Sequence, residues 1–247
     1  MLRVEQVEKS YKKGGLMSKE RQKVLQNISF VCQQGECLGI IGESGSGKST
    51  LGRLLLGIEK PDRGTILFEG KSVEEPKVRL GHISAVFQDY TSSINPFYTV
   101  EQAMMEPMKQ QRKSKQEAQS KIDQLLHQVG LNSSYRTKYP HELSGGEAQR
   151  VCIARAVATE PKCILLDEAI SSLDGSIQIQ VLELLKRLRS IYNMGYIFIT
   201  HDIQAAAYIC DRVMIIKSGQ IEEMVRIEHL KDVQSPYARK LLQMIIT

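Results

Sequence analysis

Hydrophobic and polar positions alternate at 2–4 and 28–32 in the first third of the chain, and a third, mostly apolar stretch lies at 65–68. Alternation with a period of two residues is the pattern of a strand that has one buried face. The third stretch directly follows a Pro-Asp-Arg-Gly turn at 61–64. These stretches predict an antiparallel sheet near the N-terminus.

Between about residues 100 and 130 the hydrophobic spacing becomes helical. Ile122, Leu125, Leu126 and Val129 fall on one face of a helix, and Gly130 suits the position just past its end. The pattern predicts a helical insertion.

Two short, wholly apolar runs follow, at 163–166 and 196–199. Such runs are typical of parallel strands that are buried on both faces. The segment between them has apolar residues at helical spacing, which are Ile177, Val181, Leu184, Leu185, Leu188 and Ile191. Strand, helix and strand in this order predict a βαβ unit and an α/β fold.

Composition fits a globular protein and excludes a disordered tail or a disulfide mini-protein. The 247 residues include 42% hydrophobic and 25% charged residues, and the net charge is +5. The longest apolar runs, such as 38–41 and 213–216, are far shorter than the ~20 residues of a membrane-spanning helix. With no signal-peptide pattern at the N-terminus, we expect a cytoplasmic location.

Cysteine and charge patterns exclude further classes of site. The five cysteines are odd in number and lack CxxC pairs, so we expect buried, reduced thiols. The densest basic stretch, 109–121, is interleaved with Gln and Ser rather than aromatic residues. It predicts a solvated helix face and no nucleic-acid partner.

Residues 42–49 read Gly-Glu-Ser-Gly-Ser-Gly-Lys-Ser and match GxxxxGK[ST] between an apolar run and a helix-forming stretch from Thr50. Backbone N–H groups of such a loop surround phosphates, and Lys48 would reach the β- and γ-phosphates. Ser49 would bind magnesium. The expected phosphate-binding residues are Gly42, Glu43, Ser44, Gly45, Ser46, Gly47, Lys48, Ser49 and Thr50.

Two carboxylates end the buried run at 163–168. Open α/β sheets bind ligands at this edge of their strands, where Asp167 would hold magnesium and Glu168 would polarise an attacking water. A helix cap or a surface turn is the alternative for such a pair.

A second glycine-bearing helix start lies at 143–147. The Ser144 hydroxyl, the Gly145 and Gly146 amides and a helix N-terminus would form a second anion site. Ser144 followed by Glu147 is equally a capping box, which leaves a plain helix cap as the alternative.

The segment Leu143, Ser144, Gly145, Gly146 and Glu147 resembles the signature motif of ATP-binding cassette ATPases, with Glu147 in place of the more usual Gln. The resemblance implies that this segment contacts the γ-phosphate of ATP held by the opposite subunit of a head-to-tail dimer.

Other elements of that family follow in order along the chain. Tyr11 resembles the adenine-stacking aromatic, Gln88 the Q-loop glutamine that binds magnesium and the attacking water, and His201 the switch histidine at the γ-phosphate. Their alternatives are an aromatic packed on its own sheet, a turn residue, and a core or capping histidine. Residues Ser172, Leu173 and Asp174 resemble the D-loop.

The resemblance spans nearly the whole chain and implies one ATPase domain over residues 1–247. The implied fold is a P-loop NTPase (RecA-like) core sheet with an N-terminal antiparallel β subdomain and a helical subdomain that carries the signature motif. We expect the β subdomain and P-loop core at 1–90, the helical subdomain at 91–160, and the rest of the core with a short tail at 161–247. ATP and Mg²⁺ are the implied cofactors.

Finer features resemble the peptide and nickel importer ATPases. They are the segments at 86–89, 92–96 and 235–242. Ala169 and Tyr90 stand where most relatives have proline, and the tail lacks the cysteine cluster of some peptide importers. These departures favour nickel or metal-chelate import, with di- or oligopeptide import as the alternative.

The resemblance implies a second ATPase subunit, identical or related, two membrane permease subunits and an extracytoplasmic binding protein. It places the chain peripherally at the cytoplasmic face of the membrane. A non-transport cassette is disfavoured because the long coiled-coil insertions or tandem cassettes of that class do not fit in 247 residues. A catalytically silent subunit is disfavoured because Glu168 and His201 are both present.

Overall fold

The computed structural model describes residues 1–13, 20–89, 93–109 and 114–243, which divide into two compact units. The first unit comprises Met1–Leu80 and Gly195–Thr247, and the second comprises Gly81–Met194. Tyr90 and Ser92, which help to mark the branch of the family, lie outside the described residues.

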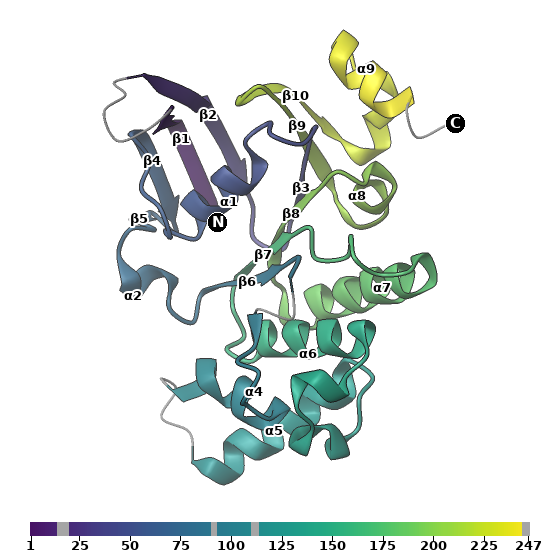
Figure 1. Cartoon of the computed structure of the whole chain (residues 1–247). Helices are drawn as coiled ribbons and strands as arrows, with labels where there is room; N and C mark the ends of the chain where they lie inside the picture. The colour runs from purple at the N-terminus through teal and green to yellow at the C-terminus, as the bar shows by residue number, and fades with distance from the viewer. Residues whose placement is uncertain (14–19, 90–92, 110–113, 244–247) are drawn as a thin grey trace. The chain divides into compact units, whose positions relative to one another are not determined.

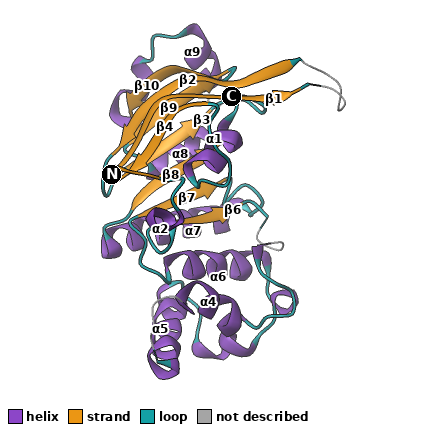
Figure 2. Cartoon of the chain, turned by 90° about the vertical axis from the view of Figure 1, so that its left-hand side faces the viewer, coloured by secondary structure: helices purple, strands orange, loops and turns teal. Residues whose placement is uncertain are grey.

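The first unit contains the predicted antiparallel sheet, in the order β2-β1-β4-β5. Figure 1 labels each of its strands, and Figure 2 shows β1, β2 and β4 in a view turned by 90°. Its strands are β1 (Leu2–Lys12), β2 (Arg21–Cys32), β4 (Arg63–Phe68) and β5 (Lys71–Ser72). Leu2 lies opposite Cys32 on one side and Phe68 on the other. All three side chains are buried, so one face of the sheet forms a core, as the alternating pattern predicts.

A second group of strands in this unit is mostly parallel. It contains β3 (Cys37–Ile41), β8 (Gly195–Thr200), β9 (Arg212–Lys217) and β10 (Gln220–Arg226). Strand β3 lies between β8 and β9, parallel to both, and β10 is antiparallel to β9. Every residue of β3 and β8 is buried, which accounts for their continuous apolar runs.

Helices cover these strands and close the first unit. They are α1 (Lys48–Leu55), α2 (Pro76–Arg79), α8 (Ile203–Ile209), the 3₁₀ segment η4 (Ile227–Asp232) and α9 (Pro236–Gln243). Helix α1 contacts both β2 and β8, and α8 contacts β3 and β8. The loop that precedes α1 is therefore anchored by both groups of strands.

The second unit contains a parallel strand pair and most of the long helices. Its elements are β6 (Ile83–Phe87), α4 (Val100–Met108), α5 (Lys115–Gln128), η2 (Ser133–Thr137), η3 (Pro140–Glu142), α6 (Gly145–Val157), β7 (Cys163–Asp167) and α7 (Gly175–Tyr192). Helices α4, α5 and α6 pack against one another (Figure 1). Ile122, Leu125 and Leu126 are fully buried in this packing, which confirms the predicted helix face.

The start of α1 differs from the one that the pattern predicts, because the helix begins at Lys48 rather than Thr50. Helix α6 begins at Gly145, directly after its cap Ser144, within the predicted helix start. Ile191 follows the helical spacing of the apolar residues of α7, but its side chain is 52% exposed. All five cysteines are buried thiols, as expected. No helix in the described part of the chain is both long and apolar enough to cross a membrane.

Candidate functional site

The loop from β3 into α1 needs glycine at two positions because other backbone atoms approach it closely. A Cβ at Gly42 would lie 2.2 Å from the carbonyl oxygen of Ile216. Gly47, the N-cap of α1, has φ of +105°, and a Cβ there would lie 2.9 Å from the carbonyl oxygen of Val24. These contacts fix the path of the backbone that the sequence predicts to surround phosphates.

The start of α1 is suited to an anion. In the described structure no side chain caps this helix, and its first turn holds no acidic residue. The first N–H groups of a helix point outward with the positive end of its dipole, so they form an anion site when no cap covers them. Lys48 is 5% exposed, and its Nζ donates to the carbonyl oxygens of Gly42 at 2.7 Å and Glu43 at 2.9 Å. The loop thus combines amide donors with a cation held close to it.

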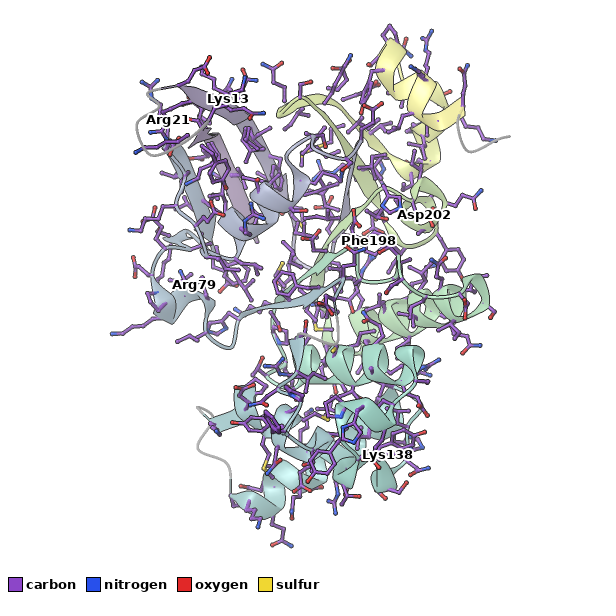
Figure 3. The ribbon with its side chains drawn as sticks, in the orientation of Figure 1. Lys13, Arg21, Arg79, Lys138, Phe198 and Asp202 are labelled. Carbon is purple, nitrogen blue, oxygen red and sulfur yellow. The ribbon has the colours of Figure 1, made fainter. Side chains whose placement is uncertain are left out.

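His201 lies at the same edge of the sheet as this loop. Ile41 of β3 pairs with Thr200 of β8 in parallel, and Gly42 and His201 are the residues that follow them. Asp202, labelled in Figure 3, caps α8 by accepting a hydrogen bond from the Ala205 N–H at 3.0 Å. His201 is exposed. The histidine is therefore neither the α8 cap nor a core residue.

Tyr11, near the end of β1, is tied to the helix that follows the loop. Its hydroxyl donates to Glu59 Oε2 at 2.5 Å, and Arg53 of α1 donates to Glu59 Oε1 at 2.6 Å. These two bonds hold the pKa of the Glu59 carboxyl below its usual value, the bond from Tyr11 being the larger cause. The Lys9 ammonium lies 5.5 Å from the centre of the tyrosine ring. Adenine stacking by this ring stays a prediction.

The second unit has a matching strand edge. Phe87 of β6 pairs in parallel with Asp167 of β7, so Gln88 and Glu168 follow at the same edge. Glu168 has φ of +48°, a left-handed conformation that few residues with a side chain adopt. Its carbonyl oxygen accepts bonds from Ser171, from the N–H at 3.2 Å and the hydroxyl at 2.9 Å, which stabilise this turn. The structure thus brings together three predicted site residues of this unit: Gln88, Asp167 and Glu168.

The start of α6 is capped by its own side chains. Ser144 Oγ accepts a bond from the Glu147 N–H at 3.4 Å, and the Ser144 N–H donates to Glu147 Oε2 at 2.8 Å. The capping box is therefore present, as the alternative for this segment predicts. Gly146 has a further reason to be glycine, because a Cβ there would lie 3.1 Å from the Ile177 side chain on α7.

Two glutamines that the sequence patterns did not single out hold the segment after Glu168. Gln149 of α6 is 1% exposed, and its Nε2 donates to the Ala169 carbonyl oxygen at 2.6 Å. Gln178 of α7 donates to the Ile170 carbonyl oxygen at 3.0 Å. The predicted D-loop, Ser172, Leu173 and Asp174, leads from this segment into α7, with Asp174 at the N-cap position. The sequence signal for Gln149 is a polar residue at helical spacing from the apolar Cys152, Ile153 and Ala156. Its partner Ala169 is distant in sequence and could not be predicted from this spacing.

Comparison with known proteins identifies the family. Residues 25–171 match the family described as ABC transporter. The chain is 50% identical over 246 residues to the metal-staphylopine import system ATP-binding protein CntF of Staphylococcus aureus (strain NCTC 8325 / PS 47), covering 98% of each chain. It is 41% identical over 230 residues to the nickel import ATP-binding protein NikE of Escherichia coli O157:H7, covering 90% of this chain and 86% of that one.

Solved structures agree with these sequence matches. The ATP-binding cassette MJ0796, solved as a dimer in a post-hydrolysis state with ADP and Pi, superposes with a TM-score of 0.82 at 29% identity, covering 92% of this chain and 99% of that one. The cbiO1 protein of Clostridium perfringens, part of the ABC transporter complex cbiONQ, gives a TM-score of 0.81 at 26% identity, covering 99% and 98%. The chain belongs to the ABC transporter family and is one of its ATP-binding, ATP-hydrolysing subunits.

Proposed function

We propose that this chain powers an importer of nickel or of a metal chelate. The observation that carries the proposal is the identity of 50% and 41% to ATP-binding proteins of a metal-staphylopine and a nickel import system. The sequence departure at Ala169 points to the same branch.

In this proposal the first unit holds the nucleotide. The backbone N–H groups of residues 42–50 and the Lys48 ammonium bind the phosphates, because in the part of the chain that the structure describes no side chain caps α1 and no acidic residue lies in its first turn. Tyr11 stacks on the adenine. His201 lies at the same strand edge as the loop and contacts the γ-phosphate.

The donor set fits Mg²⁺. Ser49 offers an exposed hydroxyl at the start of α1, and Asp167 and Gln88 offer oxygens at the edge formed by β7 and β6. Oxygen donors from hydroxyl, carboxylate and amide groups are those that Mg²⁺ prefers. When bound, the ion neutralises charge on the phosphate oxygens.

Hydrolysis in this proposal depends on the second unit. Glu168 accepts a hydrogen bond from the attacking water and polarises it toward the γ-phosphorus, giving ADP and inorganic phosphate. The start of α6, residues 143–147, acts on ATP that is held by the other ATPase subunit of a dimer. The D-loop, residues 172–174, lies beside that partner.

The remaining partners are two membrane permease subunits and an extracytoplasmic binding protein, with this chain at the cytoplasmic face of the membrane. The β subdomain with the P-loop core (1–90), the helical subdomain (91–160) and the rest of the core (161–247) form one domain.

ATP binding closes the dimer of ATPase subunits, and ATP hydrolysis reopens it.

Uptake measurements test the transported class. Cells carry the wild-type chain, Lys48→Ala, or Lys71→Ala as a control on the exposed strand β5, with expression matched. They receive labelled nickel, as the free ion and as a soluble chelate, and separately a labelled dipeptide. We expect only Lys48→Ala to lose nickel uptake, with dipeptide uptake unchanged. Loss of dipeptide uptake alone, or no change in either, would contradict metal import.

A further inference from the structure

Glu147 brings a full negative charge to the first turn of α6, and both of its carboxylate oxygens have donors. The Ser144 N–H donates to Oε2 at 2.8 Å, and the Tyr135 hydroxyl donates to Oε1. Tyr135 lies on η2, twelve positions before the glutamate, so this second bond is separate from the capping box. The carboxylate is therefore clamped between the backbone of Ser144 and a tyrosine side chain.

Lys138 supports the tyrosine from another side. Its Nζ lies 3.9 Å from the centre of the Tyr135 ring (Figure 3 labels Lys138), within the range of a cation–π contact. The hydrogen bond from Tyr135, followed by those from Ser144, lowers the pKa of the Glu147 carboxyl to about 2. The side chain is therefore charged at neutral pH.

A charged residue here carries a cost that glutamine would not. Carboxylates stabilise a helix N-terminus, but they compete with any other anion that approaches the same N–H groups. Two like charges repel, and the repulsion falls with their separation. A carboxylate that rotates freely in this turn would therefore oppose a phosphate at the start of α6.

We propose that Tyr135 is a positioning residue for ATP hydrolysis. Its hydroxyl holds the Glu147 carboxylate against the Ser144 backbone, which fixes the charge in one place. The Ser144 oxygen in turn accepts a hydrogen bond from the Glu147 N–H, so the serine and the glutamate hold each other at the start of α6. This inference rests on the proposed role of residues 143–147.

Paired variants separate this role from a structural one. Tyr135→Phe removes the hydroxyl and keeps the ring. Tyr192→Phe is the matched control, because Tyr192 also donates a hydroxyl bond, to Gln128 Oε1 at 2.8 Å, and also lies beneath a lysine. ATP hydrolysis and ATP affinity are measured for each variant in the Glu147 background and again with Glu147→Gln.

We expect Tyr135→Phe to lower kcat about fivefold through the freed charge, with ATP affinity changed by less than about twofold. With Glu147→Gln present, the same change at Tyr135 should alter kcat by less than about twofold, since no charge needs holding. An equal loss in both backgrounds would show a merely structural role and overturn the inference. Normal kcat for Tyr135→Phe while Ser144→Ala impairs hydrolysis would overturn it and spare the proposed function. Full hydrolysis by Ser144→Ala would instead remove the proposed role of residues 143–147.

Discussion

The two units each present a helix that begins at a glycine-bearing loop, yet the two helix starts are built differently. Helix α1 has Gly47 at its N-cap, no side-chain cap within the described structure and a lysine as its first residue. Helix α6 has Ser144 at its N-cap and a complete capping box with Glu147. The start of α1 can therefore bind an external anion, whereas the start of α6 already holds the carboxylate of Glu147.

This difference indicates that the two helix starts have different roles toward ATP. A loop that must hold a triphosphate needs uncovered N–H groups and a cation, and only the α1 start has both. The start of α6 is already capped by Glu147, so chiefly Ser144 remains to contact a phosphate. We therefore expect it to contact a phosphate that other groups already bind. Accordingly, the α1 start should determine nucleotide affinity, and the α6 start together with Glu168 should determine the rate of hydrolysis.

The largest expected effect is a loss of ATP hydrolysis without a loss of ATP affinity. Glu168→Gln should reduce ATP hydrolysis about 10²-fold or more, because an amide cannot polarise the attacking water as a carboxylate does. ATP affinity by calorimetry should change by less than about twofold, since the change lies in the second unit.

The matched control for this variant is Glu183→Gln on the exposed face of α7. Hydrolysis by Glu168→Gln at the rate of the control would remove Glu168 from its role. A parallel loss of ATP affinity would break the division between the two units.

A smaller effect on stability compares Gly47, the N-cap of α1, with Gly146, the second residue of α6. Gly47→Ala should lower the free energy of unfolding by about 2 kcal/mol, because φ is +105° and backbone lies 2.9 Å from the new Cβ. Gly146→Ala should change it by less than about 0.5 kcal/mol. There the close neighbour is the Ile177 side chain at 3.1 Å, and alanine favours the helix.

Urea unfolding of the two alanine variants and the wild type measures this comparison. Equal losses for Gly47→Ala and Gly146→Ala would mean that the backbone of the α1 loop is no more constrained than that of α6.

The smallest expected effect is on the free energy of unfolding, through the Glu147 carboxylate at the start of α6. Folding lowers the pKa of Glu147 from 4.5 to about 2, so its charge stabilises the folded chain above pH 4.5. At pH 7, Glu147→Gln should be less stable than the wild type by about 1 kcal/mol, a value reduced by solvent screening. The difference should shrink as the pH falls from 4.5 toward 2.

Urea unfolding at pH 7, 4 and 3 follows this trend, and Glu183→Gln, at an exposed acidic residue of α7, controls for general effects of charge. A stability difference that grows on acidification would contradict the lowered pKa.

Local patterns predicted much of the fold. Alternation revealed the antiparallel sheet, and the wholly apolar runs revealed β7 and β8, because burial on one face or on both leaves a direct mark on the sequence. The capping box at Ser144 was visible because its two partners are three residues apart. Spacing alone did not distinguish Ile191, which is exposed in the last turn of α7, from the buried residues that precede it at the same period.

Contacts between distant residues were not predictable in this way. Nothing in the spacing of Tyr135 and Glu147 indicates that they bond, and the buried Gln149 gives no sign that Ala169 is its acceptor. Such pairs depend on how helices and turns pack in three dimensions. They are nevertheless the contacts that hold the α6 start and the segment after Glu168.

The division between the two helix starts is tested most directly by ATP binding to the isolated chain, measured by calorimetry for the wild type, Lys48→Ala and Ser144→Ala. We predict that Lys48→Ala weakens ATP affinity about 50-fold, as expected for loss of a buried charge-assisted contact. Ser144→Ala should stay within about twofold of the wild type. Comparable losses for both variants, or an unchanged affinity for Lys48→Ala, would contradict the account.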